Sequence, residues 1–147
     1  MIKSYKGLIA DGGVETIPLH TNDGKTGYKI VKLSIMPNDP GGVSTEHILQ
    51  ISRLEDASYV QSPTTVVDFG DSSLIGAAIV NNNTNSSAYP ASTSVIFDNE
   101  IFNQDIYLVH KTENTTAKLN WYMALEQVKL SEDQALVAIV KNLRNEQ

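Results

Sequence analysis

Apolar and polar residues alternate most regularly between Leu119 and Glu126, close to the end of the chain. Every second position there holds a large apolar residue, and these are Leu119, Trp121, Met123 and Leu125. A period of two is typical of a β-strand with one buried face, because successive side chains point to opposite sides of a sheet. A helix would spread the same four residues around its axis. The pattern therefore predicts a strand whose inner face, Trp121 included, belongs to the core.

A second alternating run comes just before this strand, with Ile106 and Leu108 on one face. Residues 113–116 (ENTT) separate the two runs and have the polar composition of a turn. Consecutive strands joined by a short turn commonly pair with each other. We therefore expect these two strands to form a β-hairpin.

Shorter apolar segments, separated by clusters of Gly, Pro, Asn and Asp, predict further strands upstream. In residues 28–36 we expect Val31, Leu33 and Ile35 on the inner face. Pro18 removes a backbone donor from the strand predicted at residues 14–19, so we expect that strand at a sheet edge. The other predicted strands are residues 3–10, 46–54, 65–69 and 74–80, of which the last two are expected to pair across residues 70–73. Residues 55–63 are predicted to be a polar connection, and the Asn-rich residues 81–87 an exposed loop.

The last segment changes to a helical period. Ser131 followed by Gln134 is a capping box, and Leu130 and Ala135 stand at the positions of a hydrophobic staple. Acidic residues at 132 and 133 and basic residues at 141 and 144 match the helix macrodipole. We expect a helix over residues 131–147, with its apolar stripe covered either by the sandwich or by a neighbouring subunit. The stripe consists of Leu136, Ile139, Val140 and Leu143.

These elements predict a single domain over residues 1–147 that is mainly β. The expected architecture is an antiparallel β-sandwich, like a jelly roll, with one C-terminal α-helix. Residues 1–13 are expected to be available as an N-terminal arm. At 147 residues the chain can bury enough surface to fold without a metal or a disulfide.

Composition narrows the classes of partner. Seventeen acidic residues against eleven basic ones give a net charge of −6, which repels phosphate backbones, so we do not expect a nucleic-acid partner. The absence of Cys excludes disulfides, zinc–thiolate sites and thiol catalysis. The N-terminus lacks the apolar core of a signal peptide, and the longest apolar run, Leu74 to Val80, is too short to span a bilayer. We therefore expect synthesis in a cytoplasm, no membrane partner and no cofactor.

Candidate catalytic residues are sparse. His20, His47 and His110 lie in three different predicted segments, without the spacing of metal ligands. The sequence Asp68-Phe69-Gly70 spells a kinase magnesium motif, but the other kinase motifs are absent. Since no acid–base or nucleophilic pair stands at a diagnostic spacing, we do not expect an enzyme.

Three carboxylates, Asp98, Glu100 and Asp105, form an alternative candidate site. Oxygen ligands gathered in a bend would suit Ca²⁺. However, the ligand spacing and the glycine of an EF-type loop are absent, so we interpret these residues as turn residues at strand ends and expect no metal site.

Tyrosines near the predicted loops are better placed to contact a partner protein, because tyrosine is enriched at protein interfaces. The candidates are Tyr5, Tyr28, Tyr59 and Tyr89. The apolar stripe of the predicted helix is a second candidate interface.

Three stretches of the chain resemble small proteins of marine tailed phages, which infect cyanobacteria and abundant ocean heterotrophs. The stretches are TNDGKTGYKIVKLSIMPNDPG, IFDNEIFNQDIYLVHK and LNWYMALEQVKL, the last followed by a closing helix that contains LRN. The similarity extends over nearly the whole chain and is strongest from Ile96 to Lys111. The resemblance implies a virion structural protein and carries over no catalytic residues.

Together with the predicted β-sandwich, the resemblance favours a capsid decoration protein that is located in the virion. Such a protein would act through contacts between copies, in a homo-oligomer such as a trimer, and with the major capsid protein or with tail or portal proteins. The alternative is a tail or fibre module that binds a host surface or a glycan, which would place exposed aromatic residues on one loop rim.

Overall fold

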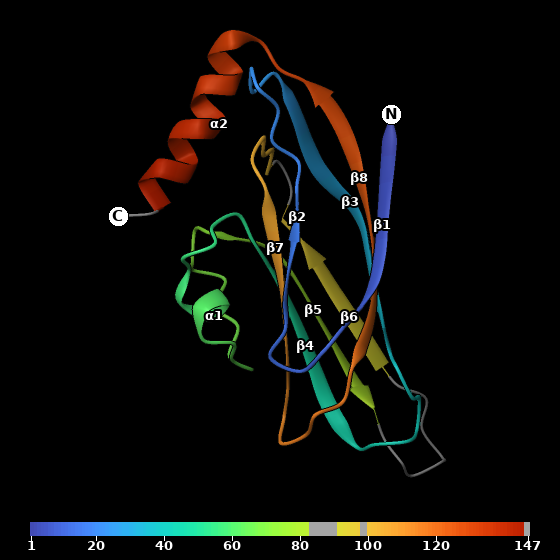
Figure 1. Ribbon diagram of the computed structural model, residues 1–147. Coiled ribbons are helices and arrows are strands. Elements are labelled where there is room, and N and C mark those ends of the chain that lie inside the picture. Colours follow the sequence, from blue (N-terminus) through green and yellow to red (C-terminus); the bar gives the residue numbers. More distant parts are fainter. Residues whose placement is uncertain (83–90, 98–99, 146–147) are drawn as a thin grey trace.

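Two antiparallel sheets face each other in the computed structural model, which describes residues 1–82, 91–97 and 100–145 (Figure 1). The three-stranded sheet has the order β1 (Ile2–Ile9), β8 (Leu119–Lys129), β3 (Thr26–Pro37). The five-stranded sheet has the order β2 (Val14–Ile17), β7 (Ile106–Thr112), β4 (Thr45–Ser52), β5 (Leu74–Asn82), β6 (Ala91–Ile96). A short helix, α1 (Ser58–Gln61), follows β4, and a longer one, α2 (Glu132–Asn145), ends the chain. The predictions of a mainly β, antiparallel sandwich and of a C-terminal helix are confirmed, whereas jelly-roll connectivity stays a prediction.

The core lies between the sheets and is organised by β8, the central strand of its sheet. The inner face predicted from the alternation is confirmed, since Leu119, Trp121, Met123 and Leu125 are all buried. Leu49 and Ile51 of β4 and Leu108 of β7 belong to the same apolar cluster. Each such side chain, when fully buried, stabilises the fold by about 1.5–3 kcal/mol.

The predicted hairpin between β7 and β8 is wrong. These strands belong to different sheets, because β7 pairs with β2 and β4 whereas β8 pairs with β1 and β3. Residues 113–118 connect the two sheets, and Asn114 adopts a left-handed backbone conformation there, with φ of 62°. Alternation shows which face of each strand is buried, and both inner faces stay buried when the strands lie opposite each other across the core. The pattern alone therefore does not distinguish a hairpin from a connection between layers.

The inner face predicted for β3 is wrong at Val31, because the strand contains a β-bulge there. The register with β8 shifts between Ile30 and Lys32, which leaves Val31 as an extra residue. Tyr28 and Ile30 before the bulge and Leu33 after it are buried, but the side chain of Val31 is 42% exposed. The bulge keeps apolar residues on the inner face where the sequence itself is out of phase by one position.

The segment between β4 and β5 covers the outer face of the five-stranded sheet. Residues 55–63, predicted as a polar connection, contain α1, and Tyr59 and Val60 of this helix are buried. The strand predicted at residues 65–69 is absent, because both edges of β5 are already paired, with β4 and with β6. Instead the backbone oxygen of Val66 accepts a hydrogen bond from Gln50 Nε2 at 3.2 Å.

The N-terminal segment is part of a sheet. Residues 2–9 pair without interruption with β8, from Ile2 opposite Glu126 to Ile9 opposite Leu119, so the predicted strand is confirmed and the segment does not extend as an arm. The edge position predicted from Pro18 is also confirmed, since β2 ends at Ile17 and is an outer strand of its sheet.

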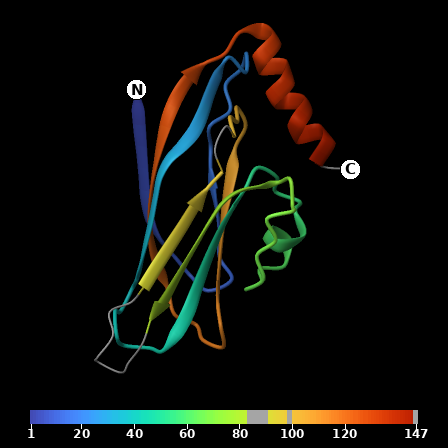
Figure 2. The same cartoon turned by 180° about the vertical axis from the view of Figure 1, so that it is seen from behind.

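The capping box of α2 is confirmed. Gln134 N donates to Ser131 Oγ at 3.2 Å, and Ser131 N donates to Gln134 Oε1 at 2.9 Å. In both views the two helices lie on the side of the five-stranded sheet, so the outer face of the three-stranded sheet is uncovered (Figures 1 and 2). Within the described residues, neither helix combines the length and the apolar character that crossing a membrane requires.

Replacement of Leu125 by Ala tests the role of β8. Leu125 is fully buried, so we expect Leu125→Ala to lower the free energy of unfolding by about 2–5 kcal/mol, because the transfer energy of the side chain is lost and a cavity remains. The matched control is Leu136→Ala, whose side chain is 61% exposed and which we expect to change stability by less than about 0.5 kcal/mol. Urea denaturation of both variants measures the difference, and equal losses would contradict the assigned core.

Candidate functional site

The predicted tyrosine interface is wrong for two of its four residues. Tyr28 is 3% exposed, its backbone pairs with that of Phe102, and both residues belong to the main core. Tyr59 of α1 is buried, and its hydroxyl lies 2.8 Å from Ser73 Oγ. Tyr5 is half-buried against the main core, and Tyr89 lies outside the described residues. The apolar rings of Tyr28 and Tyr59 fill space in the interior. Their positions near predicted loops in the sequence did not indicate this burial.

The apolar stripe predicted for α2 faces partly the wrong way. Ala135 and Ala138 are the residues of α2 that are buried, whereas Ile139 and Val140 are half-buried. Leu136 and Val137 are mostly exposed, and the side chain of Leu143 lies outside the described residues. Ile139 and Ala135 lie next to Gly24, and the helix is rotated by about one position from the expected stripe. Its exposed apolar side is therefore a surface without a partner among the described residues.

The outer face of the three-stranded sheet is a second uncovered surface. The register places Lys6, Tyr122 and Ser34 in one row across β1, β8 and β3, and Leu8, Asn120 and Met36 in the next. A shallow hollow of about 450 Å³ lies along these rows. Leu8, Met36 and Tyr122 are exposed there, with Met36 at 60%. We call this surface the basic face, because Lys6 and Lys32 are its exposed charged residues.

A groove of about 510 Å³ forms a third surface, between the covering segment and the outer side of β4, β5 and β6. Its lining is mostly apolar, with one carboxylate at Glu46. Val67 and Phe69 form one wall, and the ring of Phe69 is 57% exposed although its edge contacts Phe97 with 4.9 Å between ring centroids. Ile79 on the opposite wall is also exposed. We call this surface the acidic groove, because Glu46 lines it and the exposed Asp68 is next in sequence to its lining residues Val67 and Phe69.

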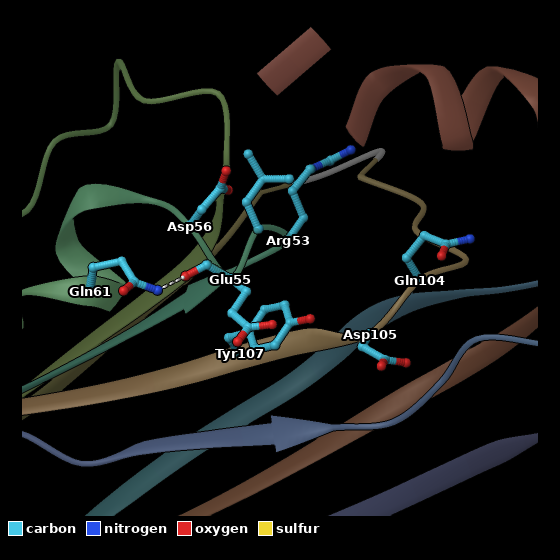
Figure 3. Close-up of a pocket in the computed structure, with 8 residues that line it drawn as sticks. Arg53, Glu55, Asp56, Gln61, Gln104, Asp105 and Tyr107 are labelled. Atoms are coloured by element: carbon cyan, nitrogen blue, oxygen red, sulfur yellow. Dashed lines mark hydrogen bonds between the residues drawn. The ribbon is translucent and has the colours of Figure 1, made fainter. Parts of the chain in front are cut away.

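A polar cleft of about 450 Å³ lies next to α1, where β4 ends and β7 begins (Figure 3). Its carboxylates make it electronegative. Burial raises the pKa of the Tyr107 hydroxyl, and the negative charges of Glu55, Asp105 and Asp56 raise it further. Gln61 Nε2 donates to the backbone oxygen of Glu55 at 2.9 Å, which ties α1 to the cleft. The lining consists of Arg53, Leu54, Glu55, Asp56, Gln61, Gln104, Asp105 and Tyr107.

The carboxylates considered for Ca²⁺ are engaged elsewhere. Asp105 Oδ1 accepts hydrogen bonds from the backbone of Leu19 at 2.8 Å and from His20 Nδ1 at 2.7 Å. The pKa of Asp105 is lowered: burial raises it, but the hydrogen bonds from His20 and Leu19 outweigh that effect. Glu100 forms an ion pair with Arg53, and Asp98 lies outside the described residues. No three His, Asp or Glu side chains in the described part of the chain gather in a way that could hold a metal ion.

The structure brings together two histidines that sequence reasoning treated as separate. His47 and His110 are both fully buried, and His47 Nδ1 lies 2.9 Å from His110 Nε2. His110 Nδ1 lies 2.9 Å from the backbone oxygen of Ala10, which can only accept. The proton of His110 is therefore on Nδ1, and its Nε2 accepts from His47 Nδ1. His47 Nε2 then remains buried without a hydrogen-bond partner among the described residues.

Burial keeps both rings neutral. It lowers the pKa of His47 to about 4, with a further lowering from the charge of His110 and an opposing effect of Asp11. Burial also lowers the pKa of His110, although the hydrogen bond to Ala10 and the charge of Asp11 act in the opposite direction. Because neither ring reaches the surface, the pair is part of the interior of the sandwich.

A signal for this pair was present in the sequence. His47 is in phase with Leu49 and Ile51, and His110 is in phase with Ile106 and Leu108, so both belong to inner faces by alternation. What the sequence could not supply is that β4 and β7 are neighbours, with His47 paired opposite Thr112.

Comparison with known proteins adds no family assignment, since neither a protein-family model nor a curated protein matches this chain.

The buried pair predicts a loss of stability in weak acid. The pKa of His47 is lower in the folded state, at about 4, than the ordinary value of 6.5, so the unfolded chain binds more protons between these values. Stability is therefore complete above about pH 6.5 and decreases as the pH falls through 4, by on the order of 2–3 kcal/mol. The lowered pKa values of Asp11 and Asp105 add a separate loss that begins only below about 3.8. Urea denaturation at a series of pH values measures both.

Proton NMR of the imidazole rings separates these contributions. We expect the ring of His47 to stay neutral down to about pH 5, because its pKa in the folded state is about 4. Asp11 and Asp105 have no imidazole signal, so the His47 resonance reports on the histidine contribution alone. Titration of His47 near pH 6.5 would contradict the buried pair.

Proposed function

We propose that this protein is a non-enzymatic structural protein of a tailed-phage virion, and that it acts as a capsid decoration protein. It binds the major capsid protein and contacts other copies of itself. The resemblance of its sequence to small virion proteins of marine phages supports the proposal. A cysteine-free antiparallel sandwich suits such a role, since its stability does not depend on the redox conditions outside the host.

The observation that carries the proposal is the gathering of exposed apolar side chains on three surfaces. Scattered exposed apolar residues are ordinary in soluble proteins, but contiguous patches mark interaction sites. Here they lie on the basic face, on the walls of the acidic groove and on the outer side of α2. The residues are Leu8, Met36 and Tyr122; Val67, Phe69 and Ile79; and Leu136 and Val137.

Burial of these residues against neighbours provides the energy for binding. Each large apolar side chain removed from water contributes about 1.5–3 kcal/mol, and a specific interface typically buries roughly 1,200–2,000 Å² in total. The core of this protein is complete within one chain, yet apolar side chains remain exposed on three surfaces. Such a protein is suited to act through contacts with other subunits.

The polar cleft favours a second candidate function, a tail or fibre module that binds a glycan. Carboxylates and amides supply acceptors and donors for sugar hydroxyls, and the half-buried ring of Tyr107 offers an apolar surface beside them. Glu55, Gln61 and Gln104 are the cleft residues that would contact the sugar.

Addition of purified protein to capsids that lack it tests the first function. We expect saturable binding with copies on the order of hundreds per particle, following the symmetry of the capsid lattice. Quantitative mass spectrometry of purified particles gives the copy number. Absence of binding contradicts the proposal, and about a dozen copies or fewer would instead place the protein at a portal, tail or fibre position.

A glycan array tests the second function, with Gln61→Ala as the variant expected to lose any signal.

A further inference from the structure

Charge is divided unevenly between the two layers of the sandwich. The strands of the three-stranded sheet contain five lysines and one glutamate, a net charge of +4. The strands of the five-stranded sheet and the covering segment, residues 53–73, contain six acidic and two basic residues, a net charge of −4. The layers thus have opposite charge although the whole chain is acidic.

The basic face combines positive charge with apolar surface. Lys6 and Lys32 are exposed and form no ion pair with a described residue; Lys32 Nζ lies 5.7 Å from the centre of the Tyr122 ring. Met36 and Leu8 extend the apolar surface next to them. The hollow, which Lys6, Met36 and Tyr122 help to line, is open to a partner.

The acidic groove combines the same features with the opposite sign. Glu46 lines it from β4, and Asp68 is an exposed residue beside the lining, next in sequence to Val67 and Phe69. Neither carboxylate forms an ion pair with a described residue, and Asp68 Oδ1 accepts the backbone N–H of Gly70 at 2.8 Å. Phe69 and Ile79 supply exposed apolar surface on the two walls.

We infer that copies of this chain associate head to tail, with the basic face of one copy docked on the acidic groove of the next. This inference rests on the proposed function in one respect, that the protein acts through contacts between copies, and it names the two surfaces involved. Opposite charges around apolar centres speed and orient association. Contact between two basic faces, or between two acidic grooves, would place like charges together and is disfavoured.

Face-to-face docking also agrees with the edges of the sheets. β1 is an eight-residue edge strand with lysines at positions 3 and 6, and charged edge strands resist pairing with another strand. A contact between two different surfaces continues from copy to copy, and it forms a closed ring if the rotation between subunits permits.

Reversing the charged residues of each surface by mutation tests the inference. We expect wild-type protein to self-associate in sedimentation velocity experiments, less at high salt, because the exposed charges are screened. The variants Lys6→Glu/Lys32→Glu and Glu46→Lys/Asp68→Lys should each be monomeric. A one-to-one mixture of the two variants should associate again, because the reversed face of one then meets the reversed groove of the other, while their unaltered surfaces also match.

The control variant Lys129→Glu/Lys141→Glu changes the net charge by the same amount at exposed positions that line neither surface, and we expect it to associate like wild type. Circular dichroism melting shows that all variants fold. Three results would overturn the inference: wild-type association weaker than about 1 mM, undiminished association of either reversed variant alone, or no association of their mixture. Because sedimentation uses no capsids, protein that stays monomeric yet binds capsids would refute the inference and leave the decoration function intact.

Discussion

Burial of one face of β8 is the interaction on which the rest of the structure depends. β8 is the only strand of its sheet with two neighbours, and its inner side chains, from Leu119 to Leu125, are in the centre of the core. β1 and β3 have no other partner within their sheet, so their positions follow from pairing with β8. The inner faces of β4 and β7 in turn belong to the same apolar cluster as β8. Removing apolar area at this strand would therefore weaken both layers together.

The two layers differ in what covers them, and this difference determines which surfaces are available for binding. The segment between β4 and β5 buries Gln50 and Val109 on the outside of the five-stranded sheet, and Tyr59 of α1 packs in one cluster with Val109. It leaves an apolar groove next to β5 and β6. Nothing in the described chain covers the outer face of the three-stranded sheet. The two surfaces differ in charge as well, so the same chain presents complementary sides to its surroundings.

Local patterns in the sequence were sufficient where a local interaction determines the structure. The start of α2 follows from Ser131 and Gln134, whose mutual hydrogen bonds involve residues three positions apart. The candidate interaction residues were less predictable, because exposure depends on segments distant in the sequence. Tyr28 is buried in the same cluster as Phe102, and Leu136 is exposed because Ala135 and Ala138 are the neighbours that are buried. The predicted strand at residues 65–69 failed for a similar reason, since both edges of its expected partner, β5, are paired with β4 and β6.

The amino-acid sequence by itself determined that the protein is mainly β, that Leu119, Trp121, Met123 and Leu125 face the core, and that a capped helix ends the chain. These features depend on periodicity and on contacts between near neighbours. Only the tertiary structure decided that β7 and β8 lie in different layers, that Val31 is a bulge, and that His47 meets His110. The physical reason is that a strand's period specifies which face is buried but not which strand covers it. That choice depends on how all strands together bury the most apolar surface while pairing their backbones.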